Sequence, residues 1–259
     1  MSTETCVICD TDGAVLERVR YYPRQLVTAS VLTTDQEYAR HKARQHNRCL
    51  HGWGVVCGLE VKANPSEEQP WRVTVCPGCL VDPLGNEIAV AAAVDFDLAT
   101  QASEDPCAGA PPCPPTGTAI AGGNDGCVYL VACYKECYSR PERVPPLGCG
   151  CDESACEYAR IREGFELGLR FALPESHVRA SKADEAWCEQ IKRWARSSDI
   201  PGPLPVPPCP ECPADPCVVI ARICLPEATG GRIGDKDISY DGRRVLYGVS
   251  ALRMFSACS

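Results

Sequence analysis

The stretch "HNRCLHGWGVVCGLEV", residues 46 to 61, decides how the first half of the chain folds. The residues before it are good helix formers, whereas Gly52 and Gly54 stand where a helix should stop. The β-branched run "VVCGLEV" that follows is typical of a strand. We therefore predict a helix-to-strand corner at this point, with Trp53 anchoring the corner in the core.

A helix is predicted before this corner and a β-meander after it. Thr34 lies three residues before Glu37, which is the spacing of a capping box, so the helix is expected over residues 33 to 50. Downstream, "WRVTVC" alternates as a strand does, and "DPLGNE" has the composition of a tight turn. We interpret residues 15 to 99 as one module, a helix followed by a β-meander.

The rest of the chain alternates between strand-like segments and loops rich in proline and cysteine. "CVYLVACYKEC" and "EYARIREGFELGLRFALP" are predicted strands, the second alternating from Phe165 to Phe171. The segment "SKADEAWCEQIKRWARSS" has helical spacing, which places on one face Trp187, Ile191 and Trp194. The expected fold class is α+β and β-dominated, with an N-terminal helix and β-meander followed by a second β-rich half with one further helix.

Composition divides the chain into segments around these elements. Besides the module at 15–99, we expect an N-terminal Cys-containing segment at 1–14, a Pro/Gly/Cys-rich insert at 100–126, a second β-rich unit with a helix at 127–198, a Pro/Cys-rich spacer at 199–216, and C-terminal strands at 217–259.

The charge and hydropathy pattern excludes several classes of protein. A formal net charge of -8 argues against nucleic-acid binding, which needs a basic surface. No apolar run approaches the roughly 18 residues of a membrane span. The start "MSTETCVICDTDG" lacks the basic residues and apolar core of a signal peptide, so we expect synthesis in the cytoplasm without that export signal.

Cysteine is the outlier, with 20 residues in 259. Such content is typical of secreted disulfide scaffolds, which conflicts with the lack of a signal peptide. Three CxxC pairs resemble zinc knuckles, and if zinc is bound its ligands are expected among Cys6, Cys9, Cys76, Cys79, Cys209 and Cys212. The pairs are too far apart for a compact zinc ribbon, so disulfides, or disulfides mixed with free thiols, are favoured. We predict no cofactor, with zinc as the alternative, and Cys49 and Cys57 are candidates for a bridge across the corner.

No set of residues has the spacing of an active site. Successive histidines of the predicted helix are five residues apart, about 140° around its axis, and are not expected to share a face: His41, His46 and His51. The aspartates of "DKDISYDG" miss the spacing of a calcium loop and are expected to lie in a turn. We accordingly predict no catalytic residue and no enzymatic activity.

One long stretch of the chain carries a family resemblance. "RYYPRQLVTASVLTTDQEYARHKARQHNRCLHGWGVVCGLEV", followed by "VTVCPGCLVDPLGNEIAV", resembles bacterial proteins associated with phage-tail-like contractile injection systems, and tail-fibre and baseplate modules of phages. "VVIARICLPE" and "EYARIREGFEL" are shorter matches to the same group. The resemblance covers residues 18 to 99 strongly and 155 to 250 weakly. It departs at Tyr22-Pro23-Arg24, where the group has an aromatic-x-Gly, and at Cys76 and Cys79, where the group has ordinary residues.

The resemblance implies a structural, non-catalytic role in a particle, as a fibre or baseplate-associated attachment or adaptor protein. It implies self-association, as a trimer by analogy with fibres, and contacts with other particle components; a cell-surface target is a further candidate partner. Such particles are assembled in the cytoplasm and released by lysis, after which thiols would oxidise. Two alternatives stay open: a Cys-rich zinc-binding interaction module, and a carbohydrate-binding or carbohydrate-active protein.

Overall fold

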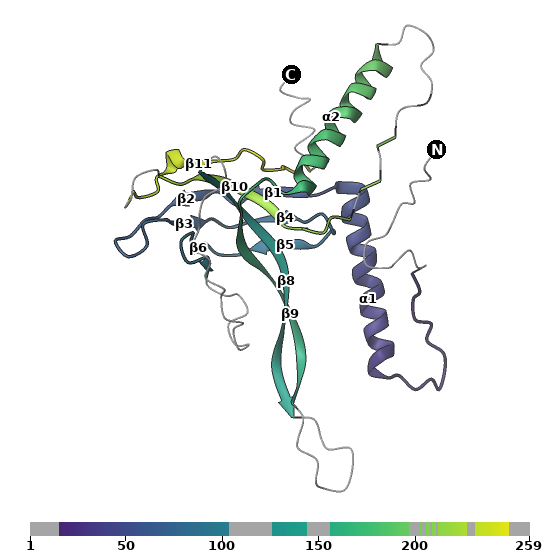
Figure 1. The fold of residues 1–259 in the computed structure, drawn as a ribbon. Helices are drawn as coiled ribbons and strands as arrows, with labels where there is room; N and C mark the ends of the chain where they lie inside the picture. Colours follow the sequence, from purple (N-terminus) through teal and green to yellow (C-terminus); the bar gives the residue numbers. More distant parts are fainter. Residues whose placement is uncertain are drawn as a thin grey trace.

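The computed structural model describes residues 16–103, 126–143, 156–196, 212–226 and 231–248, together with residues 203, 206, 207, 209 and 210. It confirms a β-dominated α+β fold in which an N-terminal helix is followed by strands (Figure 1). The helices are α1 (Ala29–His46), a π-helical turn (Asn47–His51), α2 (Glu175–Ala195) and a 3-10 turn (Asp235–Asp237). The strands are β1 (Gly54–Gly58), β2 (Val61–Ala63), β3 (Arg72–Val75), β4 (Gly78–Val81), β5 (Glu87–Val90), β6 (Val94–Asp97), β7 (Ala102–Ser103), β8 (Cys127–Arg143), β9 (Cys156–Arg170), β10 (Val218–Cys224) and β11 (Ile238–Ser239).

The strands of the first half are shared between two antiparallel sheets. One has the order β1-β4-β5 and the other the order β2-β3-β6-β7. The chain passes from the first sheet to the second at Gly58 and Leu59, which have φ values of 64° and 55°. It returns to the first sheet at Cys76 and Pro77, between β3 and β4. A Cβ on Gly58 would lie 2.2 Å from the carbonyl oxygen of Pro77, so the two crossing points are in contact and only glycine fits at position 58. The predicted meander is thus a set of short strands that alternate between two sheets.

The third sheet, in the order β11-β10-β8-β9, ends in a projecting ribbon. Strand β9 pairs with β8 from Tyr129 opposite Arg170 to Arg143 opposite Cys156. Strand β10 pairs only with the first part of β8, up to Ala132. Beyond that point β8 and β9 form a two-stranded ribbon that leaves the body of the molecule on the same side as α1 (Figure 1).

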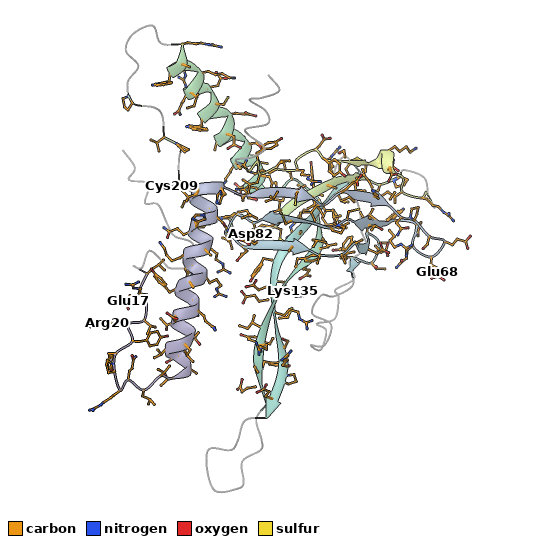
Figure 2. All side chains as sticks on the ribbon, turned by 180° about the vertical axis from the view of Figure 1, so that it is seen from behind. Glu17, Arg20, Glu68, Asp82, Lys135 and Cys209 are labelled. Carbon is orange, nitrogen blue, oxygen red and sulfur yellow. A yellow bond between two sulfur atoms is a disulfide. The ribbon has the colours of Figure 1, made fainter. Side chains whose placement is uncertain are left out.

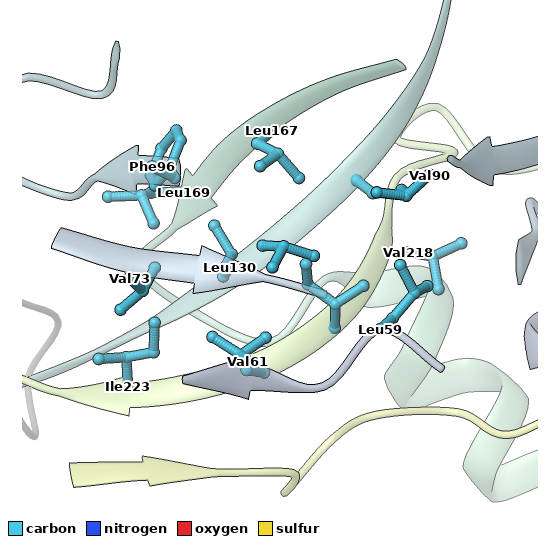
Figure 3. Packing of buried hydrophobic residues seen from close by; sticks show 14 of the residues in the cluster. Leu59, Val61, Val73, Val90, Phe96, Leu130, Leu167, Leu169, Val218 and Ile223 are labelled. Atoms are coloured by element: carbon cyan, nitrogen blue, oxygen red, sulfur yellow. The ribbon is translucent and has the colours of Figure 1, made fainter. Parts of the chain in front are cut away.

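The hydrophobic core lies between these sheets. Figure 3 shows Phe96 of the second sheet, Leu130 and Ile223 of the third, and Leu59 at the crossing point around one centre. Each of these four side chains is fully buried, which stabilises the fold by roughly 1.5–3 kcal/mol per side chain. Buried residues from 55–98, 128–169 and 218–233 belong to the same cluster, so the sheets share one core.

Both long helices begin earlier than the sequence predicts. Helix α1 is capped by Thr28, whose hydroxyl accepts a hydrogen bond from the Val31 N–H at 3.4 Å. Thr34 is not the cap, because its hydroxyl donates to the carbonyl oxygen of Ser30 inside the helix. Helix α2 begins directly after Pro174. All three residues of the α2 face predicted from helical spacing are half-buried: Trp187, Ile191 and Trp194. No described helix combines the length and the apolar character that crossing a membrane requires.

Two disulfides clamp strands β8 and β10 together. Cys127 is bonded to Cys224, directly opposite in the ladder, and Cys133 is bonded to Cys217 at its other end. Most of the paired residues between the two bridges are fully buried, for example Leu130 and its partner Ala221, whereas Tyr129 and Arg222 are half-buried. The centre of the third sheet is therefore held by packing and by covalent bonds at both ends of the ladder.

Candidate functional site

The corner that follows α1 is a π-turn. The Gly52 N–H donates to the carbonyl oxygen of Asn47 at 2.9 Å, five residues back, and Gly52 ends the helix with a φ of 81°. Trp53 then packs against the core, and Gly54 has a φ of 140° where the chain meets the backbone of Arg244. The helix end predicted at Gly52 and the anchor predicted at Trp53 both agree with this geometry.

The π-turn also brings two histidines together. The Nε2 atoms of His46 and His51 lie 3.2 Å apart and their rings meet edge to face. The prediction that these two residues do not share a face is wrong, because it assumes the regular α-helical step of about 100° per residue. The five-residue hydrogen bonding of a π-turn returns residues five apart to the same side. Both rings are exposed, and one Nε2 can donate a hydrogen bond to the other.

Polar contacts attach the C-terminal end of α1 to the turn between β4 and β5. Arg44 Nε donates to Asn86 Oδ1 at 2.6 Å, and Asn47 Nδ2 donates to the Gly85 carbonyl oxygen at 3.0 Å. Arg48, only 6% exposed, donates through Nε to the Pro83 carbonyl oxygen and through Nη2 to that of Pro210, each at 3.0 Å. Hydrogen bonds from arginine and asparagine side chains thus hold this end of the helix in place of the apolar packing that usually does so.

The turn that receives α1 is shaped by a buried carboxylate. Asp82 accepts hydrogen bonds from the backbone N–H groups of Leu84 and Asn86 and from the Asn86 side chain. Burial raises the pKa of Asp82, although these hydrogen bonds oppose the rise. Gly85 follows with a φ of 87°, and a Cβ there would lie 2.3 Å from the Arg44 carbonyl oxygen. The tight turn predicted from "DPLGNE" is confirmed, and its glycine lets α1 approach.

A groove of about 790 Å³ runs between α1, this turn and the β8–β9 ribbon. Figure 2 shows the arrangement from behind, with Asp82 near the turn and Lys135 on the ribbon. Arg40 Nη1 of α1 donates to Glu136 Oε1 of the ribbon at 2.9 Å, and the Tyr134 hydroxyl donates to the same oxygen at 2.9 Å. Burial, and then the bond to Glu136, raise the pKa of Tyr134. These groups connect the groove walls to each other.

Large apolar side chains are exposed on α1, on the segment that leads into it and on the ribbon. Five of them lie in the segment that leads into α1 and in its first turns: Tyr21, Tyr22, Leu26, Val27 and Leu32. The ribbon adds Ile161 and the stacked pair Tyr138 and Tyr158, whose ring centroids are 5.9 Å apart. Meanwhile α1 buries none of its own residues. Exposed apolar groups gathered in this way are typical of an interaction surface.

The outcome differs from one predicted cysteine pair to the next. Cys57 lies against Cys79, with the two Sγ atoms 3.2 Å apart, and is not bridged to Cys49, which is an exposed free thiol. Cys212 is disulfide-bonded, so it has no thiolate to offer as half of a zinc pair with Cys209. Cys6 and Cys9 lie outside the described residues. Within the described ranges, no three His, Cys, Asp or Glu residues are grouped so that they could hold a metal ion.

Helix α2 is held to the body by a buried histidine that the sequence did not single out. His177 Nε2 accepts a hydrogen bond from the Val219 N–H at 3.1 Å, and its ring lies edge-on to Trp53 with centroids 4.7 Å apart. The Arg244 guanidinium stacks on the Trp53 ring, 5.0 Å from its centroid, and forms an ion pair with Asp184 of α2. Burial, and then Arg244, lower the pKa of His177 to about 4. No local pattern reveals this contact, because its members come from four separate parts of the chain.

Comparison with known proteins gives a weak structural likeness. No protein-family model matches the chain, and no curated protein matches it. A solved structure described as the crystal structure of TssK aligns with 62% of this chain at 12% identity and a TM-score of 0.34. The aligned part is 36% of that chain, so this protein spans about a third of its length. A TM-score this low does not establish a shared fold.

Proposed function

We propose that the chain is a structural, non-catalytic component of a phage-tail-like contractile injection particle, acting as a fibre or baseplate-associated attachment or adaptor protein. The resemblance of residues 18 to 99 to such components supports this role. The observation that carries it is the surface formed by the segment 21–32, α1 and the β8–β9 ribbon, which we call the α1–ribbon surface. This surface exposes apolar groups and is fastened to the body mainly by polar contacts.

The α1–ribbon surface is difficult to explain by the needs of the fold alone. Most of the stability of a helix in a protein comes from the packing of an apolar face and not from the propensity of its residues. Helix α1 buries no residue, and the apolar side chains nearby point to solvent. A two-stranded ribbon is likewise marginal without a third strand or a packed face. Both elements gain stability when a neighbouring subunit covers them.

The groove chemistry favours docking over catalysis. Two of its arginines, Arg40 and Arg44, form ion pairs with Glu136, and the tyrosine hydroxyl of the groove donates to the same glutamate. Groups paired in this way position the walls of the groove. In our proposal the chain assembles in the cytoplasm with other particle components, forms a trimer, and leaves the cell within the released particle.

The test is quantitative mass spectrometry of contractile particles purified from the organism that encodes the chain. We expect the protein to co-purify with sheath and tube at a fixed low ratio, and immunogold labelling to mark one end of the particle. Absence from purified particles, with the protein abundant in the cell, would overturn the proposal. Light scattering of the isolated chain tests the trimer separately, because a monomer of 28.0 kDa would exclude it.

A matched pair of variants tests the α1–ribbon surface itself. Leu26 is 82% exposed next to α1, and Val206 is 83% exposed in the spacer. Neither substitution by serine should alter folding of the isolated chain, because neither side chain is packed. We expect Leu26→Ser to reduce incorporation into particles at least tenfold and Val206→Ser to leave it unchanged. Equal incorporation of both variants would exclude Leu26 from the docking surface.

A further inference from the structure

Two free thiols face each other across strands β1 and β4. Cys57 and Cys79 are directly opposite in the antiparallel ladder, and their Sγ atoms are 3.2 Å apart. Directly opposite residues of an antiparallel pair have Cα atoms about 4.5–5.5 Å apart, which is inside the range that a disulfide spans. The two sulfurs can therefore bond after a small side-chain rotation, without movement of the strands.

The surroundings hold this pair in place. On one side of it, Gly58 is opposite Gly78, and a Cβ on Gly78 would lie 2.4 Å from the Cys57 carbonyl oxygen. On the other side, Val55 bonds through its backbone to Arg244 and Leu246 at 2.8 Å each. Strands fixed on both sides keep the two thiols at contact distance, which raises their effective concentration toward each other.

The two thiols differ in access. Cys57 is exposed, so a dissolved oxidant reaches it first, whereas Cys79 is partly buried. Burial, and then the contact with Cys57, raise the pKa of the Cys79 thiol. Cys57 is thus the group placed to attack, and Cys79 is the group placed to resolve the product.

We propose that Cys57 and Cys79 form a reversible modification site that reacts with low-molecular-weight disulfides of the glutathione type and closes a cross-strand disulfide between β1 and β4. The Cys57 thiolate attacks one sulfur of the small disulfide, a mixed disulfide forms, and one small thiolate leaves with the bonding electron pair. Cys79 then loses its proton and attacks the Cys57 sulfur, which expels the second small thiolate. The two protein thiols lose two electrons, and their two protons end on the two small thiols.

This site does not depend on the proposed particle role and can be tested on the isolated full-length chain. The protein is incubated in glutathione redox buffers of increasing ratio of disulfide to thiol, then alkylated, digested and analysed by mass spectrometry. We expect a crosslink between residues 57 and 79 at a lower ratio than any modification of Cys49 or Cys188, two exposed thiols elsewhere in the chain. Faster or equal modification of Cys49 or Cys188 would overturn the proposal.

Cys76 needs a control of its own, because it lies three residues from Cys79 and is a free, partly buried thiol. The crosslink should form unchanged in Cys76→Ser. In Cys79→Ser, glutathione should remain trapped on Cys57, whereas in Cys57→Ser, Cys79 should be modified at least tenfold more slowly. A bridge that joins Cys57 to Cys76, or equal trapping on both single variants, would contradict the assigned roles.

Thermal unfolding supplies a second readout that does not need the variants to fold. Closing a loop of 22 residues in the wild-type chain should raise the melting temperature by about 5 °C or more. Adding a small dithiol should reverse the rise while the bridges of β8 and β10 stay intact, because each of them has one buried cysteine, Cys127 in the first and Cys217 in the second. Crosslinking without any rise would mean that the bond strains the ladder and is not a built site.

Discussion

The sheet body and the projecting elements of this protein are held together by different forces. In the body, side chains from three sheets fill one core, and two disulfides clamp β8 to β10. The projecting helix α1 buries no residue and depends on arginine and asparagine bonds to a turn and a ribbon. Core burial and cross-links are worth several kilocalories per mole each, whereas exposed ion pairs are worth less than one. The body is therefore built to keep its shape, and the α1–ribbon surface is built to be completed by a partner.

The largest expected effect comes from the two nested disulfides. The bridge at Cys133 and Cys217 is six positions along β8, and seven positions along the other chain segment, from the bridge at Cys127 and Cys224. With the outer bridge intact, the inner one closes a loop of about 13 residues, and its replacement by two alanines should cost about 3 kcal/mol. Replacement of both bridges should cost about 7 kcal/mol, because the unfolded chain then also loses the constraint of the outer bridge, whose loop includes the long connection between β8 and β10.

Urea unfolding followed by circular dichroism measures both values. Cys188→Ala, which removes an exposed thiol on α2, is the matched control and should change the free energy of unfolding by less than about 0.5 kcal/mol. If removal of either bridge alone costs as much as removal of both, the nested arrangement is not what stabilises the body.

A cavity in the core should have the next largest effect. Leu130 on β8 is 0% exposed and belongs to the cluster shared by all three sheets. Leu130→Ala should lower the free energy of unfolding by about 3–4 kcal/mol, since it removes buried methyl groups and leaves a void. Leu26→Ala, at an exposed position beside α1, should change it by less than about 0.5 kcal/mol. Similar losses for the two variants, by urea titration, would mean that the segment before α1 is part of the body.

Local patterns in the sequence predict the elements of the body well. Phe165, Leu167 and Leu169 alternate on β9 and are buried as predicted, because a half-buried strand imposes a period of two. Phe171, which continues the pattern, is exposed because β9 ends at Arg170. The stop at Gly52 was predictable for a similar reason, since a positive φ at a helix end favours glycine.

Features that depend on distant partners were not predictable from the sequence. The bridged cysteines are 97 and 84 residues apart, and no spacing rule chooses them from 20. The contact between His46 and His51 depends on a π-turn, which changes the register of a helix without a visible signal in its composition. The groove arises because β8 and β9 extend past β10, and strand length beyond a sheet is set by pairing and not by local propensity.

Lowering the pH should loosen α2 before it affects the rest of the body. The pKa of His177 is about 4 in the folded chain, below its ordinary value of 6.5. Between these values the unfolded chain binds a proton that the folded chain excludes, so stability is complete above pH 6.5 and is lost as the pH falls toward 4. The loss should reach about 3 kcal/mol.

Urea midpoints of the wild type and of His177→Gln, each measured at pH 7 and at pH 4.5, check this dependence. Glutamine keeps an acceptor for the Val219 N–H but does not titrate, so the variant should lose less stability on acidification than the wild type. His41→Gln on α1 is the control and should behave as the wild type does. An unchanged pH slope in His177→Gln would show that His177 does not couple α2 to the proton concentration.

The smallest effect on stability is expected at the ion pair between α1 and the ribbon. The Arg40 and Glu136 side chains are both partly exposed, so solvent screens their attraction. A double-mutant cycle with Arg40→Gln and Glu136→Gln should give a coupling of about 0.2–1 kcal/mol that declines in 1 M salt. Hydrogen exchange should nevertheless become faster along α1 in either variant, since few other contacts fasten it. A coupling above about 2 kcal/mol would mean that α1 belongs to the rigid body, and the groove would then be a fixed feature of the fold instead of a surface that waits for a partner.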